Sequence, residues 1–442
     1  MAGNGIYHSD FKAMPYWWEA YHPTAQDPVD LPKRVRVAIV GGGYGGLSTA
    51  LESAKQGVDS VVLEAAELGF GASTRNGGGV SGGVNIGKGY FGKTLDPESD
   101  RAHAVLAEGG DVFSLIERLI AEEGIECHWK KNGRFTGAWT PTHYAEQAEK
   151  VARLNDDAKA EAYMVPRERQ REEIASDYYY GGMVVERSAS LHPALYYKGL
   201  LDACRKRGVP VCARAPVTRI TERTGGWLVK TARGDVEADE VVIATNGYTG
   251  DATPELKLRI VPVASHIIAT EELPPDLAAS LIPRGRTLGD TRRVLCYYRM
   301  SPDGRRMVFG GRARFTPVTP QKSAPILHRF MTDRFPQLRG AKVTHAWTGN
   351  LGFTMDKLPH MGQQSRMHYL MGCNGSGVAM MTYLGWQTAR KIAGVANQPS
   401  AFDTEDFPTH PLYNGNPWFL PALGGWFRFR DNVDRRMAAF SS

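Results

Sequence analysis

The sequence predicts an α/β fold that contains a parallel sheet and an additional sheet, and three observations support this prediction. Residues 34–64 have the pattern of a strand, a glycine-rich turn, a helix and a second strand, which is the repeating unit of a parallel sheet. Short apolar strands recur at residues 209–212, 227–231 and 236–243. The 49 glycines and 26 prolines indicate many turns, which fits an α/β protein with an added sheet better than a helical bundle.

The glycine-rich turn has the spacing of a dinucleotide-binding loop. A β-branched strand at residues 35–40 runs into Gly-Gly-Gly-Tyr-Gly-Gly at residues 41–46, and a helical segment follows. In a G-x-G-x-x-G loop, Gly41 would permit the tight turn, Gly43 would let the backbone approach a pyrophosphate, and Gly46 would let the helix pack against the strand. The N–H groups that begin this helix would face the phosphates.

An acidic residue ends the second strand of this unit. Residues 58–63 are apolar and are followed by Glu64, whose carboxylate can accept hydrogen bonds from both hydroxyls of a ribose. An acidic residue here favours an unphosphorylated ribose, so the dinucleotide is FAD or NAD and not NADP. The alternative is a glycine turn in an ordinary crossover between strands, which does not require all of these features together.

Three further segments favour FAD over NAD. Residues 69–79 form a second glycine-rich loop that offers backbone donors to another part of the same cofactor. Residues 241–247 are typical of an apolar strand that ends in small residues, and residues 372–377 open a helix that is expected to run to about Ala393. Reduced flavin carries negative charge near N1 and the C2 carbonyl, and a helix N-terminus stabilises such charge, whereas nicotinamide needs no such site.

Several segments of the chain occur together in one known family. They are Val40–Gly46, Gly69–Gly78, Asp177 with Tyr178, Gly181 with Gly182, His192 with Pro193, Trp347–Asn350 and Gly372–Gly377. On these residues the chain resembles the FAD-dependent D-amino acid oxidase superfamily, and within it the γ-glutamylputrescine oxidoreductase group, from about Trp18 to Asp434. It departs from the usual pattern at Cys373 and Asn374, ahead of Gly375, and at His266, where members often carry an amide.

The resemblance implies a discontinuous, Rossmann-like FAD-binding domain, interleaved with a substrate domain that is built on a mainly antiparallel sheet. It also implies FAD, bound noncovalently, because Cys373 is expected beside the pyrimidine end of the ring and no residue is placed for attachment. The expected boundaries are 34–98, 186–256 and 341–397 for the FAD-binding domain, 99–185 and 257–340 for the substrate domain, 1–33 for an N-terminal arm and 398–442 for an irregular C-terminal tail. The residues expected to bind FAD are Gly41, Gly43, Tyr44, Gly45, Gly46, Glu64, Gly71, Ala72, Ser73, Arg75, Asn76, Gly77, Gly78, Val217, Thr245, Asn374, Gly375, Ser376, Gly377 and Val378.

Apolar spacing and turn residues predict the remaining elements. His192 and Pro193 stand at the start of one helix, so His192 is interpreted as a capping or packing residue more than a catalytic one. Helices are expected at residues 97–124, 141–156, 194–207 and 322–335, and strands at 127–139, 177–186, 260–270, 294–300, 307–311 and 342–347.

In related folds the second sheet covers the flavin, which supplies candidates for the substrate site. The candidate catalytic residues are His266, Tyr297, Tyr298 and Trp347, and the candidate substrate-binding residues are Arg299, Tyr298 and Trp347. Only one of the two adjacent tyrosines can face the flavin, because side chains alternate along a strand. Arg299 could bind a carboxylate bidentately or form a salt bridge within the sheet, and the aromatic residues could equally belong to the core.

No second dinucleotide motif is present, so the substrate itself should reduce the flavin. For an amine, the reaction is hydride transfer from the carbon next to a neutral nitrogen to flavin N5, after which the imine hydrolyses; burial of the amine can supply the neutral form. The expected substrate is a γ-glutamylated polyamine or a similar amine, with dioxygen or another electron acceptor. The alternatives are an oxidase or dehydrogenase of a secondary or cyclic amino acid, and a flavoprotein without turnover that serves as a binding partner.

Composition supports a cytoplasmic enzyme. The 442 residues, of which 42% are hydrophobic and 23% charged, can bury a large core, and the net charge of +6 is thinly spread, with no nucleic-acid-binding motif. Five cysteines are scattered without a C-x-x-C pattern, so neither a metal site nor a redox-active disulfide is expected. The N-terminus lacks a basic region with an apolar core, and no run has the length of a membrane span.

Overall fold

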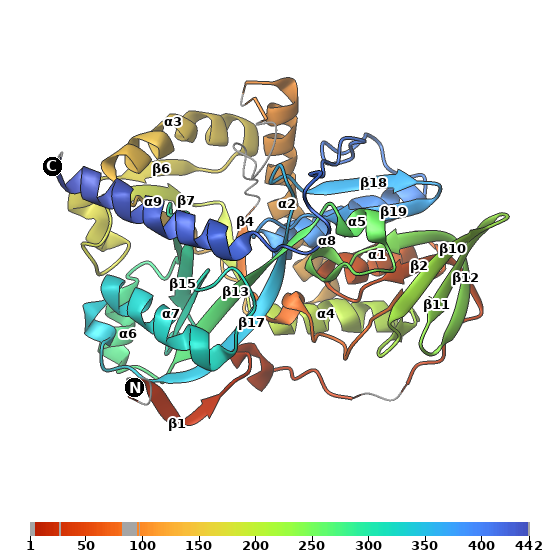
Figure 1. Cartoon of the computed structure of the whole chain (residues 1–442), viewed down its shortest axis with the longest axis horizontal. Coiled ribbons are helices and arrows are strands. Elements are labelled where there is room, and N and C mark those ends of the chain that lie inside the picture. Colours follow the sequence, from red (N-terminus) through yellow and green to blue (C-terminus); the bar gives the residue numbers. More distant parts are fainter. Residues whose placement is uncertain (1–4, 26–27, 82–94, 97, 441–442) are drawn as a thin grey trace.

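The computed structural model describes residues 5–25, 28–81, 95–96 and 98–440, and the statements below concern these residues. Parts of the predicted arm, of the segment 34–98, of the tail and of the helix expected at 97–124 (residues 1–4, 26–27, 82–94, 97 and 441–442) lie outside them. The chain forms two large sheets, each with its own helices (Figure 1). None of the helices in this part of the chain is long and apolar enough to cross a membrane.

The first sheet has eight strands among the described residues and contains the glycine-rich unit. β12 pairs in parallel with β2, β2 with β3, and β3 with β9, so the predicted parallel sheet is present. β12 also pairs antiparallel with β11 and in parallel with β19. The strands are β10 (Val217–Arg223), β11 (Gly226–Thr231), β12 (Gly234–Ile243), β2 (Arg34–Val40), β3 (Ser60–Leu63) and β9 (Val211–Cys212), with β18 (His360–Gln364) beside β19 (Met367–Met371).

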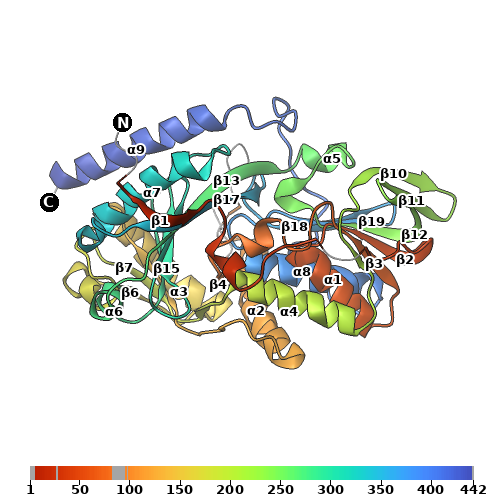
Figure 2. The ribbon, with the colours of Figure 1, turned by 90° about the horizontal axis from the view of Figure 1, so that it is seen from below.

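Four long helices pack together against one face of this sheet (Figure 2). Their apolar faces bury Leu47, Ile116 and Leu200 against strand residues such as Ile39 and Val62. The helices are α1 (Tyr44–Lys55), α2 (Asp100–Glu123), α4 (Pro193–Lys206) and α8 (Gly377–Ile392). α2 was predicted from its apolar spacing, α1 and α8 as helices that follow glycine-rich turns, and α4 as the helix that His192 and Pro193 open. α2 ends at Gly124, whose φ of 62° is the left-handed conformation that glycine favours at a helix end.

The second sheet has nine strands among the described residues and is mainly antiparallel, as predicted. Only the outer pair β1·β17 and the pair β14·β5 are parallel. In order across the sheet the strands are β1 (Tyr7–Lys12), β17 (Val343–Phe353), β13 (Val261–Thr270), β16 (Met307–Gly311), β15 (Cys296–Met300), β14 (Thr287–Asp290), β5 (Arg134–Gly137), β7 (Gly182–Val185) and β6 (Ala162–Val165).

One face of the nine-stranded sheet is closed by a second hydrophobic core. Phe309, Tyr298 and Leu327 lie in this core, which α6 (Pro275–Leu281) and α7 (Pro320–Arg334) cover. The opposite face looks towards the eight-stranded sheet. The remaining elements are the helices α3 (Pro141–Ala158) and α5 (Pro254–Lys257), the strand pair β4 (Gly79–Ser81) and β8 (Ser188–Ser190), and the 3-10 turns η1 (Tyr16–Glu19), η2 (Ala72–Thr74), η3 (Arg167–Glu172), η4 (Asn246–Tyr248) and η5 (Pro336–Leu338).

The C-terminal segment differs from the prediction, because it ends in a long helix and not in an irregular tail. α9 (Leu420–Phe440) runs along the outside next to α7 (Figure 2). Its Leu420, Leu423 and Phe427 pack beside Phe315, and a Cβ on Gly424 would lie only 2.6 Å from the Phe315 ring. A glycine is therefore tolerated within this helix because it permits close packing.

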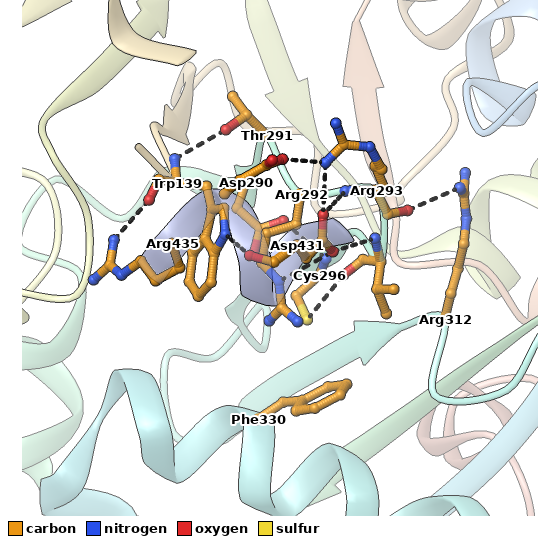
Figure 3. A network of polar contacts seen from close by, with 12 residues as sticks. Trp139, Asp290, Thr291, Arg292, Arg293, Cys296, Arg312, Phe330, Asp431 and Arg435 are labelled. Carbon is orange, nitrogen blue, oxygen red and sulfur yellow. Dashed lines mark hydrogen bonds and ion pairs between the residues drawn. The ribbon is translucent and has the colours of Figure 1, made fainter. Parts of the chain in front are cut away.

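A buried carboxylate anchors α9 to the second sheet (Figure 3). Asp431 is fully buried, and its carboxylate accepts hydrogen bonds from the backbone N–H groups of Arg293 at 3.1 Å and Val294 at 3.0 Å. The guanidinium of Arg293 lies 3.3 Å from the same carboxylate, and Trp139 Nε1 donates to the Asp431 carbonyl at 2.9 Å. The helix thus holds the turn between β14 and β15 in place.

The strand boundaries also differ from those predicted. β17 extends to residue 353 and belongs to the nine-stranded sheet, although the predicted boundary at 341 assigned it to the FAD-binding domain. Residues 7–12 of the predicted arm form β1, which pairs with β17. The strands expected at 127–139 and 177–186 shrink to β5 and β7, because the flanking residues form turns and loop hydrogen bonds such as Tyr180 N–H to the Ala138 carbonyl.

Candidate active site

A cavity of about 1200 Å³ lies between the two sheets. It begins at the glycine-rich turn of the first sheet and ends on the open face of the second. Of the residues expected to bind FAD, all except Gly46 line it. Gly46 instead allows α1 to pack closely on the turn after β2, because a Cβ at this position would overlap the Gly41 carbonyl oxygen.

The turn after β2 adopts a conformation that other residues would disturb. Gly41 has a φ of 105°, and a Cβ on it would lie 2.9 Å from the carbonyl oxygen of Ala244. The N–H of Tyr44 donates to Ser73 Oγ at 3.0 Å. Gly43 is the N-cap of α1 and provides no side-chain cap, and Gly43, Tyr44 and Gly45 line the cavity. Uncapped N–H groups of this kind form an anion site.

Glu64 lies at the end of β3 and lines the cavity. Its carboxylate accepts hydrogen bonds from the N–H groups of Gly42 at 2.8 Å and Ala66 at 3.0 Å. These bonds fix the orientation of the carboxylate, and a carboxylate retains lone pairs for a further donor. A ribose hydroxyl could therefore be bound here.

The second glycine-rich loop is held by its own polar side chains. Asn76 donates to the Ser73 carbonyl at 2.9 Å and accepts from Gly78 N–H at 2.8 Å. Arg75 donates to the Phe70 carbonyl at 2.7 Å, and its guanidinium lies 4.5 Å from the centre of the Trp18 ring. The side chains of Arg75 and Asn76 thus shape the loop.

The N-terminus of α8 forms the third side of the cofactor region. Gly372 and Gly375 have φ values of 83° and 99°, and α8 begins at Gly377 without a side-chain cap. Asn374 donates to the Gly372 carbonyl at 2.8 Å, and the buried thiol of Cys373 lies 3.5 Å from the Gly352 carbonyl. Two helix N-termini, a glycine cradle and a carboxylate therefore line one elongated cavity, and this set fits FAD.

The open face of the nine-stranded sheet carries one of the candidate tyrosines to the cavity. The hydroxyls of Tyr297 and Ser265 are hydrogen-bonded at 2.8 Å, and burial raises the pKa of Tyr297 to about 12, so this hydroxyl is neutral near pH 7. The ring lies flat on Gly310, where a Cβ would overlap it, and a Cβ on Gly77 would lie 2.9 Å from it. Tyr297 therefore lies where the second glycine-rich loop and the second sheet meet.

The other candidates do not direct their side chains to this point. Tyr298 borders the cavity, but its ring stacks on Phe309 at 4.9 Å in the second core and its hydroxyl bonds to that of Tyr179 at 2.9 Å. His266 is fully buried on the same closed face and shares a hydrogen bond of 2.8 Å with Thr348 Oγ1. Strand alternation explains both results, because Tyr297 and Ser265 occupy the cavity face and their neighbours must point away.

Trp347 and Arg299 lie on the cavity side of the sheet but are engaged in packing. Trp347 is buried next to Trp17 and donates to the Arg75 carbonyl at 2.8 Å. Arg299 is buried and donates to the carbonyls of Leu191 at 2.8 Å and Gly78 at 3.4 Å, and burial lowers its pKa to about 10. Arg299 thus joins the sheet to the second glycine-rich loop through Gly78. Neither carboxylate binding nor a salt bridge within the sheet, the two roles predicted for Arg299, is seen among the described residues.

His192 has the role predicted for it. It is the N-cap of α4, and its Nδ1 accepts a hydrogen bond from Leu195 N–H at 3.3 Å. Burial lowers its pKa to about 3. In the described part of the chain, no group of three or more histidine, cysteine, aspartate or glutamate side chains could hold a metal ion.

Sequence reasoning missed several polar residues of the cavity, of which three matter below. Arg134 and Thr136 of β5, and Arg312 just after β16, line it. The alternation of Arg134 and Thr136 with the buried Phe135 is a weak signal for one polar strand face, but it does not reveal which cavity that face meets.

The fold and the site define a class of protein, an FAD-dependent oxidoreductase. Comparison with known families supports this assignment, because residues 36–391 match the family described as FAD dependent oxidoreductase. The chain therefore belongs to that family, and the family resemblance inferred from the sequence is confirmed.

Individual relatives are similar over almost their whole length. Gamma-glutamylputrescine oxidoreductase of Escherichia coli (strain K12) is 32% identical over 403 residues, which cover 90% of this chain and 93% of that protein. Probable oxidoreductase OrdL of Haemophilus influenzae is 31% identical over 405 residues, with 88% and 89% covered. Among solved structures, glycine oxidase from Geobacillus kaustophilus has the same fold, with a TM-score of 0.71, 19% identity, and 86% of this chain and 99% of that chain covered.

Proposed function

We propose that this protein is an amine oxidoreductase that uses noncovalent FAD to oxidise the CH–NH group of a γ-glutamylated polyamine or a similar amine. The observation that carries the substrate class is the 32% identity to a gamma-glutamylputrescine oxidoreductase over 90% of the chain. The alternative substrates are secondary or cyclic amino acids. The buried position of Cys373, whose thiol lies against the Gly352 carbonyl, supports noncovalent binding.

The residues of the cavity can bind an amine and keep it neutral. The Tyr297 and Ser265 hydroxyls can each accept or donate a hydrogen bond, so together they can position the amine nitrogen. Burial raises the pKa of Tyr297, whereas the hydrogen bond to Ser265 and the positive charge of Arg312 lower it in part. The charge of Arg312 therefore acts at the position of the Tyr297 hydroxyl. Both the cation and desolvation disfavour a bound ammonium and favour the neutral amine.

No strong base is needed at this position. Burial lowers the pKa of His266 to about 4, but this imidazole lies on the closed face of the sheet. When bound along the glycine-rich turns and Glu64, FAD would supply a hydride acceptor for the carbon next to the neutral nitrogen, and water would hydrolyse the resulting imine. The protein contributes orientation, desolvation and the hydroxyl pair.

A panel of amines mixed with the protein under anaerobic conditions tests this proposal through flavin absorbance. γ-Glutamylputrescine should bleach the flavin much faster than L-proline, sarcosine or putrescine. Faster bleaching by a secondary or cyclic amino acid would favour the alternative substrates. A flavin that no amine bleaches would favour a binding protein without turnover.

A further inference from the structure

Among the residues that the structure describes, Arg134 places a guanidinium in the cavity without a hydrogen-bonding partner. It begins β5, and its side chain lies flat over Gly289 of the adjacent strand β14, where a Cβ would be 2.8 Å from Nη2 and 3.6 Å from Cζ. Within the described residues, the Arg134 side chain takes part in no hydrogen bond or ion pair. Any side chain at position 289 would displace the guanidinium from this position.

Other arginines of the cavity have partners. Arg293 pairs with Asp431 at 3.3 Å (Figure 3). It also pairs with Asp434 at 2.5 Å. Arg312 donates to the Arg293 carbonyl at 3.5 Å and lies 4.8 Å from the centre of the Phe353 ring. Compared with these two side chains, that of Arg134 is free to bind an anion.

The surroundings do not neutralise Arg134. Burial lowers its pKa, and the charge of Asp290 opposes that effect in part. The Asp290 carboxylate, however, already accepts hydrogen bonds from Arg334 at 2.5 Å and Tyr179 at 3.3 Å. A guanidinium that is partly desolvated without a paired carboxylate costs stability, and an incoming anion would offset that cost.

A neighbouring hydroxyl completes a site for a carboxylate. Thr136 lies two residues further along β5, on the same face of the strand, and lines the cavity. A guanidinium can bind a carboxylate with two parallel N–H···O bonds, and a threonine hydroxyl can donate a third.

We propose that Arg134 and Thr136 form a carboxylate subsite that binds the end of the amine substrate remote from the oxidised carbon. This inference rests on the proposed function and specifies its substrate class. Gly289, beneath the guanidinium, pairs across β14 and β15 with Tyr297. The Tyr297 hydroxyl lies over Gly310 on β16, and Ser265 is on the next strand, β13. These positions are two to three strands away from Gly289, and because neighbouring strands are about 4.8 Å apart, the carboxylate subsite lies roughly 10–15 Å from the two hydroxyls.

This separation selects between two kinds of substrate. In a simple amino acid, the carboxylate is attached to the carbon next to the nitrogen, so it cannot occupy the subsite while the nitrogen lies at Tyr297. In a γ-glutamylated amine, many bonds separate the α-carboxylate from the oxidised carbon, so one molecule can reach both places. The subsite therefore favours a long ω-amine with a distant carboxylate.

The subsite is tested by comparing two proteins, the parent and Arg134→Gln, with two substrates that differ only in the carboxylate. Anaerobic flavin reduction is measured with γ-glutamylputrescine and with 4-aminobutanoylputrescine, which lacks the carboxylate. In Arg134→Gln, the half-saturating concentration of γ-glutamylputrescine should rise about tenfold to a hundredfold, with little change in the limiting rate, because charged hydrogen bonds are lost. The carboxylate-free amine should react equally with both proteins, and Arg134→Lys should be intermediate.

Two comparison variants separate this effect from loss of charge or fold. Arg219→Gln removes an exposed arginine on β10, at the far edge of the other sheet, and should match the parent protein. Arg312→Gln changes another arginine of the cavity. The inference would be overturned if Arg134→Gln raised the half-saturating concentrations of both substrates equally. It would also be overturned if only Arg312→Gln raised that of γ-glutamylputrescine without changing that of the carboxylate-free amine.

Calorimetric titration with glutarate tests the subsite without turnover. The FAD-loaded parent protein should bind glutarate, and Arg134→Gln should bind it at least tenfold more weakly. No binding by the parent, or equal binding by both, would overturn the subsite. Binding that depends on Arg134 in a protein that γ-glutamylputrescine cannot reduce would instead refute the proposed function.

Discussion

The hydroxyl of Tyr297 lies 2.8 Å from the Oγ of Ser265, and this pair marks where the cofactor loops and the second sheet meet. The tyrosine ring lies between two glycines, Gly310 in the sheet beneath it and Gly77 in the FAD loop, whose Cβ atoms would contact it. Neither position can carry a larger side chain without moving the ring. The hydroxyl pair is therefore placed by the packing of both domains.

Tyr297→Phe should slow anaerobic flavin reduction about tenfold to a hundredfold, because the loss of an orienting hydrogen bond costs on the order of 1–3 kcal/mol. FAD content should not change. Tyr298→Phe is the matched control, since its hydroxyl lies in the second core against Tyr179, and it should reduce flavin at the parental rate. Equal rates in Tyr297→Phe and the parent would show that the amine binds elsewhere.

Glu64→Ala should raise the dissociation constant of FAD about tenfold or more, because the ribose hydroxyls lose a charged acceptor. The change also removes the acceptor of Gly42 N–H, which loosens the phosphate turn. Glu64→Gln should be intermediate. Fluorescence titration of the apoprotein with FAD measures the effect, and undiminished affinity in the alanine variant would contradict the role assigned to Glu64.

Asp431→Asn should lower the free energy of unfolding by about 1–3 kcal/mol, because a buried charged acceptor of backbone and guanidinium groups is lost. The half-saturating substrate concentration of the variant should also rise, since the turn that Asp431 holds lines the cavity. Denaturant unfolding and flavin reduction rates measure the two effects. Asp406→Asn, at an exposed position, serves as the control, and equal stability of both variants would contradict the anchoring role.

Stability should fall as the pH drops below about 6.5. Burial lowers the pKa of His266 to about 4, whereas an unfolded histidine titrates near 6.5, so between these values the unfolded chain binds a proton that the folded chain does not. The contribution of His266 is complete above about pH 6.5 and is reduced by about 2 kcal/mol at pH 5.

His266→Gln removes this titration, and its unfolding free energy should therefore depend less on pH between 6.5 and 5. His192 and His345, whose pKa values burial lowers to about 3 and about 4, remain and contribute in the same direction. The flavin reduction rate should stay parental, because His266 bonds to Thr348 on the closed face of the sheet. A rate loss above tenfold in this variant would contradict that placement.

Local sequence patterns were sufficient to predict the glycine-rich segments that line one end of the cavity. The glycines at 41–46 and the acid at Glu64 need only a strand, a turn and a helix in succession, and that order is visible in the chain. The apolar spacing of α2, the His192-Pro193 start of α4 and the glycine-rich segment that opens α8 are equally local signals. α9 was missed because two adjacent glycines and several arginines interrupt its apolar spacing. Its apolar residues pack on Phe315, which lies in a distant segment of the chain, so no local pattern revealed the helix.

The substrate side depends on contacts that no local pattern contains. Alternation required Tyr297 and Tyr298 to face opposite ways, but only the position of α7 and its core decides which face is closed. Trp347 was expected at the cavity and is covered by Trp17 of the N-terminal segment, more than 300 residues earlier. Arg134 comes from β5, and its place over Gly289 depends on the parallel pairing of β5 with β14.

The most direct test of the proposed function is the anaerobic rate of flavin reduction by γ-glutamylputrescine, compared with putrescine in the same stopped-flow experiment. Putrescine has the same ω-amine but lacks the carboxylate that Arg134 is proposed to bind. The account predicts rapid bleaching by γ-glutamylputrescine and half-saturation by putrescine only at a concentration at least tenfold higher. Equal reduction by both amines, or none by γ-glutamylputrescine, would contradict it.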